Sequence, residues 1–206
     1  MKKAAVIIDG GFVRITFQKY FKRKDVPTPD HILLLGSNVL NDNEELFRIY
    51  YYDCLPFEKE LKKPISKEIF FNKELVLAGK KFISALSLKD WIAYRSGQLK
   101  FGGWSLKQEK IDEIIKSKRC ITDDDFRPLF KQKRIDIKIG LDIAWLSIRK
   151  IVDRIILIAG DSDFVPAMKL ARIEGIQIVT VPLKNPVNPD MKEHSDEIRD
   201  FDISKL

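Results

Sequence analysis

The stretch Arg154–Asp163 reads RIILIAGDSD, an apolar run that ends in glycine and two nearby aspartates. A continuous apolar run of this length is typical of a strand that is covered on both faces, as in a parallel sheet. Residues 4–11, AAVIIDGG, repeat the pattern, and Asp9 stands where Asp161 stands in the later run. We therefore expect two buried strands, over 4–8 and 154–159, that each lead into a carboxylate.

Further apolar and aromatic runs alternate along the chain with helical patterns. Additional strands are expected at 46–53, 135–137 and 176–181, and helices at 12–23, 30–41, 67–88, 139–152 and from Asp161 to Glu174. Strands that alternate with helices predict a doubly wound, mostly parallel α/β fold with helices on both faces of the sheet. The length and the hydrophobic content favour a single domain over 1–206.

The middle of the chain, at about 55–130, is expected to be an inserted region built from a helix and a hairpin. We expect a loop over 54–67 and a hairpin over 91–101 that turns near Ser96-Gly97. Residues 103–132 are charged and weakly periodic, so the sequence predicts no definite element there.

The charge balance favours a polyanionic partner. The chain has 37 lysine and arginine residues against 30 aspartate and glutamate residues, a net charge of +7, and such a surface attracts nucleic acid. The apolar run after the N-terminus is too short for a signal peptide, no run reaches the length of a membrane span, and the two cysteines match no metal or redox spacing. We therefore expect a cytoplasmic protein with free thiols and no membrane partner.

The acidic residues at strand ends are the strongest indication of chemistry. Ligands of doubly wound sheets bind beyond the carboxyl ends of the strands, and Asp9 and Asp161 occupy those ends, with Asp163 two residues further on. Asp136 is expected in the short strand 135–137, and Asp142 early in the helix that follows it. Carboxylates that converge at one edge suit Mg²⁺ or Mn²⁺, and such ions can activate water against a phosphodiester.

Structural roles are the alternative for each of these residues. Asp161 and Asp163 could cap a helix or favour its dipole, and Asp142 could pair with a neighbouring arginine or lysine. The run 123–125, three aspartates, is typical of a solvated cap. His31 and His194 occupy unremarkable positions and Ser162 has no visible base, so other catalytic chemistries are poorly supported.

Three motifs resemble those of the NYN domain family, in the LabA-like branch of the PIN-like nucleases. They are Val6–Gly11 (VIIDGG), Lys133–Asp142 (KRIDIKIGLD) and Gly160–Pro166 (GDSDFVP), of which the third is the most specific. Weaker similarities occur at 51–53, 97–100 and 194–196. The resemblance spans most of the chain and is poorest at about 55–130.

The resemblance implies a Rossmann-like, PIN-like fold and a metal-dependent endoribonuclease that uses Mg²⁺ or Mn²⁺. By motif, Asp9, Asp136, Asp161 and Asp163 would be the catalytic, metal-binding acids, Asp142 would support them, and Lys133 would contact phosphate or orient Asp136. The implied partner is RNA, with DNA as the other substrate left open, and the sequence also leaves open whether the chain forms a homo-oligomer.

Two positions depart from the family pattern, and they keep other functions open. Phe12 stands where many members have asparagine, and Arg134 where they have glycine. One alternative is therefore a PIN-like module that binds nucleic acid or a partner protein without cutting. A phosphatase or a phosphoacceptor domain is a lesser alternative, because each usually carries a further acid beside Asp9.

Overall fold

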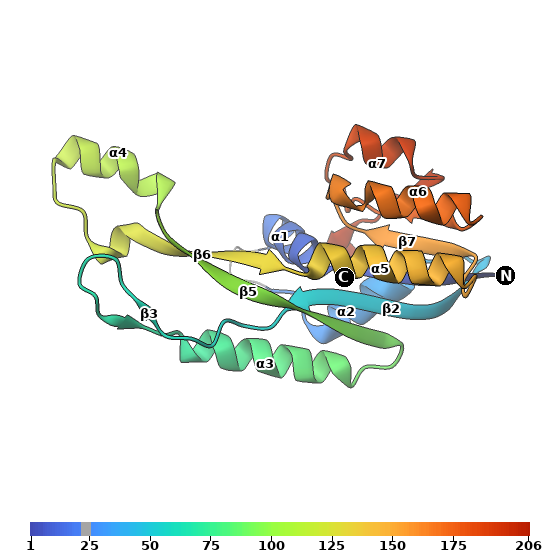
Figure 1. Ribbon diagram of the computed structural model, residues 1–206, viewed down its shortest axis with the longest axis horizontal. Coiled ribbons are helices and arrows are strands. Elements are labelled where there is room, and N and C mark those ends of the chain that lie inside the picture. The colour runs from blue at the N-terminus through green and yellow to red at the C-terminus, as the bar shows by residue number, and fades with distance from the viewer. Residues whose placement is uncertain (22–25) are drawn as a thin grey trace.

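The computed structural model describes residues 1–21 and 26–206, and in this part of the chain the central feature is a seven-stranded sheet (Figure 1). The strand order is β6-β5-β2-β1-β7-β8-β9, and the described pairs are parallel except β5 with β6. The strands span β1 Lys2–Asp9, β2 Glu44–Cys54, β5 Ile92–Leu106, β6 Phe126–Lys133, β7 Arg154–Ile158, β8 Gln177–Thr180 and β9 Glu197–Ile198. The predicted mostly parallel α/β fold is confirmed.

Helices cover both faces of this sheet and complete a Rossmann-like, PIN-like architecture (Figure 1). On one face lie α1 Gly10–Tyr20, α2 Pro29–Asn38, α3 Lys73–Ser87 and η3 Ile203–Lys205; on the other lie α5 Ile135–Ile148, α6 Val165–Ile173 and α7 Pro189–Glu193. In β1, Val6 and Ile8 pack toward the first group, whereas Ala5 and Ile7 pack toward the second. The apolar run is continuous because both faces of the strand are buried.

The middle of the chain extends beyond the sheet as an arm (Figure 1). It is formed by the outer parts of β5 and β6, with α4 Gln108–Ser117 and η1 Asp123–Asp125 between them and a small antiparallel pair, β3 Leu61–Lys62 and β4 Ile69–Phe70, beside them. The rings of Phe57, Phe101 and Phe130 pack together, with centroids 5.1 Å apart for Phe57 and Phe130. Aromatic contacts therefore organise the region that sequence periodicity described least well.

The predicted hairpin over 91–101 is wrong, because residues 92–106 form one long strand. Gly97 lies inside it, where an added Cβ would come within 2.5 Å of Ile135 Cδ1 and 2.9 Å of Cys54 Sγ. The glycine is therefore required by close packing and not by a turn. The predicted loop over 54–67 contains β3, and the helix predicted from Lys67 begins at Lys73.

The predicted strand 135–137 is also wrong, because these residues form the first turn of α5. Ile135, Ile139 and Ile143 recur at helical spacing and are fully or almost fully buried, which overrides the short β-branched pattern at its start. Elsewhere α1 begins at Gly10 and ends at Tyr20, and Lys22 and Arg23 of the predicted helix lie outside the described residues. No helix among the described residues is long and apolar enough to cross a membrane.

A buried ion network joins β2, β7 and the segment after β9 at the amino end of the sheet. Glu44 Oε2 accepts from Arg199 at 2.8 Å and from the Asn41 amide at 2.7 Å, and Glu44 Oε1 accepts from Arg154 and from Arg199. Burial alone raises the pKa of Glu44, but the hydrogen bonds from Arg199, Asn41 and Arg154 outweigh it and lower the pKa to about 2. This carboxylate is therefore stabilised in its charged form.

We predict that Glu44→Gln lowers the free energy of unfolding by about 3 kcal/mol at pH 7, because Arg154 and Arg199 lose their most buried counter-charge and keep only Glu197. The folded-state pKa of Glu44 lies below its unfolded value, so this contribution is present above about pH 4.5 and is lost as the pH falls toward 2. Urea unfolding from pH 7 to pH 3 should show the wild type and variant converging. The exposed neighbour Glu45 provides the control in Glu45→Gln, and an equal loss in both variants would contradict the prediction.

Candidate functional site

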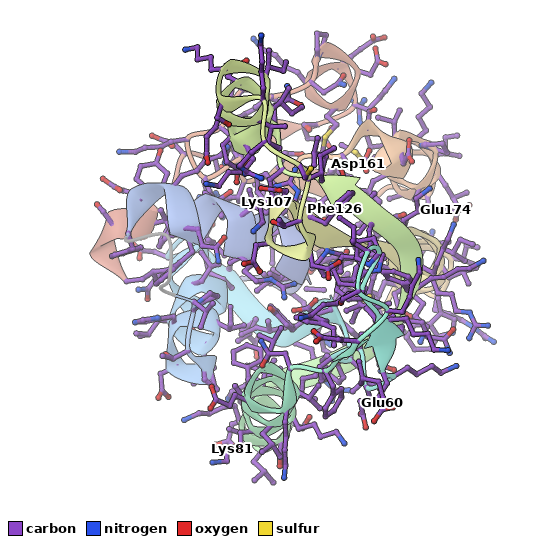
Figure 2. The ribbon with its side chains drawn as sticks, turned by 90° about the vertical axis from the view of Figure 1, so that its left-hand side faces the viewer. Glu60, Lys81, Lys107, Phe126, Asp161 and Glu174 are labelled. Carbon is purple, nitrogen blue, oxygen red and sulfur yellow. The ribbon has the colours of Figure 1, made fainter. Side chains whose placement is uncertain are left out.

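Asp9 and Asp161 lie at the same edge of the sheet because β1 and β7 are adjacent and parallel. Ile8 pairs with Ile158, so the two chains leave the sheet side by side. Both aspartates line one surface depression of about 460 Å³, which is shared with Gly11, Phe12, Gln132 and Ser162 (Asp161 is labelled in Figure 2). The two strand-end acids are therefore brought together as the parallel arrangement requires.

Asp136 and Asp163 belong to the same electrostatic neighbourhood. Asp136 lies in the first turn of α5, and Asp163 in η2, Ser162–Phe164. Partial burial raises the pKa of Asp136, and the negative charges of Asp161 and Asp163 raise it further. The acids at this edge thus repel one another in the absence of a cation.

Asp9 has the most strongly raised pKa of these acids, mainly because of burial. Burial raises the pKa of Asp9 to about 6 against the hydrogen bonds from Phe12 and Gly11, with smaller contributions from the charges of Asp136 and Asp53. A partly buried carboxylate near other carboxylates is costly to ionise. The folded chain therefore holds Asp9 in an environment that disfavours its charge.

Capping explains part of the placement of Asp9 and Asp161. Asp9 Oδ1 accepts from the amides of Gly11 at 2.9 Å and Phe12 at 3.2 Å, and Asp161 Oδ1 accepts from the amide of Asp163 at 3.0 Å. Within the described residues, Oδ2 of Asp9 and Oδ2 of Asp161 have no hydrogen-bond partner, and neither side chain is in an ion pair. Each aspartate thus caps a helix with one oxygen and leaves the other open.

The donor set suits a hard divalent cation in its chemistry. Carboxylate oxygens without a basic partner are the ligands that Mg²⁺ and Mn²⁺ prefer. Across residues 1–21 and 26–206, however, no three Asp, Glu, His or Cys side chains stand close enough together to hold an ion as they are placed. The acids therefore form an open group around the depression and not a closed cage.

Asp142 has partners outside this group, and Lys133 ends the strand that carries Gln132 to the depression. Asp142 Oδ2 accepts from Tyr52 Oη at 2.6 Å and Arg95 Nε at 3.0 Å, which is the pairing with arginine that the sequence left open. Lys133 ends β6 with an exposed side chain, and its amide donates to Cys54 Sγ. We therefore regard Asp142 as a partner of Tyr52 and Arg95 and leave it out of the ligand set proposed below.

The sequence-based site did not include Asp53 and Arg14. Asp53 follows Tyr52, which pairs with Asp9, so it emerges at the end of the neighbouring strand. It is buried, and its Oδ1 accepts from Arg14 Nη2 at 2.7 Å and from the Cys54 amide at 2.7 Å. The position of Asp53 near the end of the aromatic strand could have indicated it from the sequence. Its pairing with Arg14 could not, because that pairing depends on how α1 packs.

The two departures from the family pattern have clear structural positions. Phe12 lies against Gly160, where an added Cβ would come within 2.7 Å of the ring, so this ring fills space between the ends of β1 and β7. Arg134 precedes α5 with φ of 73°, in the left-handed region. Glycine adopts that conformation at less cost than arginine, which accounts for the glycine at this position in the resembling motif.

A family model described as the NYN domain matches residues 71–201, more than half of the chain. The chain belongs to the NYN domain family. Members of this family are generally nucleases. The matched range includes Asp136, Asp161 and Asp163 and begins after Asp9 and Asp53.

Comparison with solved structures supports the fold of this NYN domain protein. A crystal structure of a protein of unknown function from Vibrio parahaemolyticus RIMD 2210633 is similar, with a TM-score of 0.54 and 12% sequence identity. The similarity covers 98% of this chain and 93% of that chain. A search of curated proteins found no significant match.

We predict that Asp9→Asn raises the free energy of unfolding at pH 8, without divalent cations, by about 1–2 kcal/mol. The folded-state pKa of Asp9 lies above its unfolded value of 3.8, so stability falls as the pH rises through about 4 to 6. Asparagine keeps the capping oxygen and removes the charge. Urea unfolding at pH 5 and pH 8 measures the effect, with Asp112→Asn on exposed α4 as the control. A variant less stable than the wild type at pH 8 would count against it.

Proposed function

We propose that the chain is a metal-dependent endoribonuclease that hydrolyses RNA phosphodiester bonds at the depression lined by Asp9 and Asp161. The observation that carries the proposal is that two strand-end carboxylates share one depression, and each leaves an oxygen without a partner in the described residues. Asp136 and Asp163 add negative charge beside it, on a chain whose net charge is +7. A cation would offset that repulsion, and the basic surface would hold the flanking phosphates.

Each acid has a proposed role toward Mg²⁺ or Mn²⁺. A bound ion of this kind supplies Lewis-acid stabilisation of the phosphate and a more acidic water. Asp9 and Asp161 would bind it through their open oxygens, and Asp136 and Asp163 would complete the ligand set or orient the attacking water. Lys133, at the end of β6, would contact a phosphate of the substrate.

The proposed setting follows from the sequence and the family. RNA is the proposed substrate and DNA the alternative, since both present the same phosphodiester to the acids. We place the chain in the LabA-like branch of the PIN-like nucleases on its three motifs, and in the cytoplasm. Self-association as a homo-oligomer is left open.

A second function is favoured by the open arrangement of the acids. No three potential ligands in the described residues stand close enough to hold an ion, and Phe12 fills space beside Gly160. These observations support a PIN-like module that holds RNA without cutting it. Tight binding of Mn²⁺ separates the two functions, because a module without activity does not require the ion.

We predict that the wild type cleaves single-stranded RNA in the presence of Mn²⁺ and that excess chelator abolishes cleavage. Asp9→Asn and Asp161→Asn should each lower the rate on the order of 100-fold or more, because each removes a proposed ligand. A gel assay on end-labelled RNA gives the rates, and Asp112→Asn should retain the wild-type rate. Cleavage that persists in chelator and in both variants would rule out the mechanism.

We predict that Phe12→Asn increases the affinity for Mn²⁺ about threefold to tenfold, because it replaces an apolar ring beside the acids with a polar group. Phe12→Ala is the matched control, since it opens the same space and adds no oxygen. Calorimetric titration of Mn²⁺ into the three proteins compares them. If alanine and asparagine raise the affinity equally, space and not the amide is responsible.

A further inference from the structure

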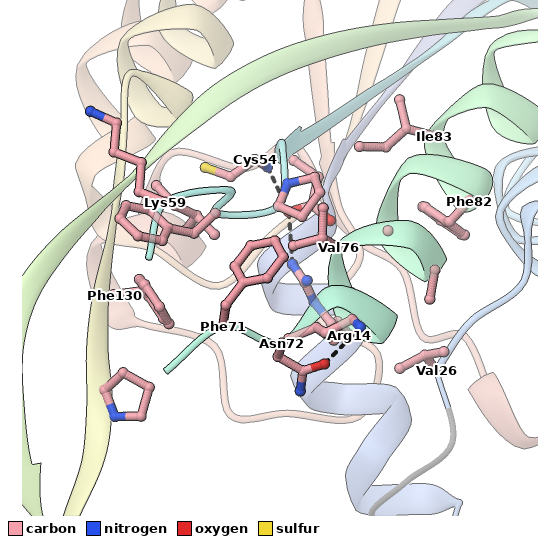
Figure 3. Close-up of a pocket in the computed structure, with 18 of the residues that line it drawn as sticks. Arg14, Val26, Cys54, Lys59, Phe71, Asn72, Val76, Phe82, Ile83 and Phe130 are labelled. Carbon is pink, nitrogen blue, oxygen red and sulfur yellow. Dashed lines mark hydrogen bonds and ion pairs between the residues drawn. The ribbon is translucent and has the colours of Figure 1, made fainter. Parts of the chain in front are cut away.

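A second cavity, of about 420 Å³, lies between α1, α3, the segment after β2 and the arm (Figure 3). Its walls are mainly apolar and include the rings of Phe57, Phe71, Phe82 and Phe130. Phe71 is 41% exposed and Phe130 38% exposed. Exposed aromatic surface that lines a concave site is typical of a ligand-binding site.

The polar groups of this cavity offer donors to a ligand. Arg14 lines it together with Asp53, and Arg14 Nη2 donates to Asp53 Oδ1 at 2.7 Å. The other donors of this guanidinium have no partner among the described residues, whereas both oxygens of Asp53 accept hydrogen bonds. The site therefore suits a flat apolar ring that carries an acceptor oxygen.

The cavity adjoins the acidic depression across α1 and β6. Helix α1 contributes Gly11 to the depression and Arg14 to the cavity, while β6 contributes Gln132 to the depression and Phe130 to the cavity. Tyr51, which also lines the cavity, lies directly behind the acidic edge: a Cβ on Gly10 would come within 2.6 Å of its hydroxyl. The two sites therefore share walls formed by α1 and β6.

We infer that this cavity receives one unpaired nucleobase of the RNA strand whose phosphate lies at Asp9 and Asp161. Bases carry the flat faces that stack on phenyl rings, and uracil, cytosine and guanine carry a carbonyl oxygen that can accept from Arg14. The exposed Lys59 at the cavity provides a positive charge for the backbone. The inference rests on the proposed action on RNA, and it limits that action to unpaired strands, since a paired base cannot enter.

Binding of single-stranded RNA in chelator tests this inference without requiring cleavage. Fluorescence anisotropy would compare a labelled oligoribonucleotide with versions that carry one abasic nucleotide at successive positions. For the wild type, one position should weaken binding about tenfold when its base is removed, the size expected for loss of one stacked base. The salt dependence of binding should stay the same, because no phosphate contact is lost.

Phe71→Ala should weaken binding of the intact RNA about tenfold and abolish the difference between intact and abasic RNA. Phe71→Leu keeps apolar volume without an aromatic face and should give a partial loss, which separates stacking from a folding defect. Leu77→Ala is the control, because Leu77 is exposed on α3, the helix that begins just after Phe71, and does not line the cavity.

Three results would overturn the inference. They are abasic substitutions that have no effect at any position, a Phe71→Ala protein that still distinguishes abasic from intact RNA, and an apolar dye bound in the cavity that the RNA does not displace. Cleavage with Mn²⁺ together with any of these leaves the nuclease proposal standing and removes the base site. Base-dependent binding without cleavage supports the base site and removes the nuclease proposal.

Discussion

The parallel pairing of β1 with β2 on one side and β7 on the other fixes where the strand-end acids of the candidate site lie. It sends Asp53, Asp9 and the segment that carries Asp161 out of the sheet at one edge. The opposite edge has the contrary electrostatics, since there Glu44 is held between Arg154 and Arg199. The buried acid Glu44 has its pKa lowered to about 2, whereas the partly buried acid Asp9 has its pKa raised to about 6. Arginines thus neutralise the buried acid at the amino end of the sheet. The acids Asp9 and Asp161, at the end that is open to a ligand, have no such partner in the described residues.

The sequence predicted the parts of the fold that depend on local pattern. The apolar runs of β1 and β7 need both faces buried, so they pointed to a parallel sheet and placed Asp9 and Asp161 at its edge. Gly97 and Asp136 were misread because their conformations depend on distant residues: Gly97 is fixed by Ile135 and Cys54, and Asp136 by the helical packing of α5. The pairing of Asp53 with Arg14 could not be predicted from the sequence either, because the two residues lie on different elements, β2 and α1.

The arm is continuous with the sheet because β5 belongs to both. Residues 92–97 of β5 pair with β2, and residues from Gln98 onward pair with β6. β6 in turn places Gln132 at the acidic depression and Phe130 at the aromatic cavity, and it leads directly into Arg134 and α5. A shift of the arm would therefore move one wall of each site together. Under the proposed function, this shared strand would let the arm help to position the substrate.

The acids of the candidate site stand on elements of different kinds. Asp9 and Asp161 are fixed by the sheet and by their capping bonds, whereas Asp136 and Asp163 stand on a first helical turn and a short 3-10 helix. The raised pKa of Asp9 and of Asp136 means that ionising them in the free protein is unfavourable. A divalent cation would offset this repulsion and stabilise the folded state by its own binding free energy. The burial and the charge repulsion that disfavour these carboxylates in the free chain would thus favour binding of the ion, so the stability of the free chain and its affinity for the ion are opposed at this edge.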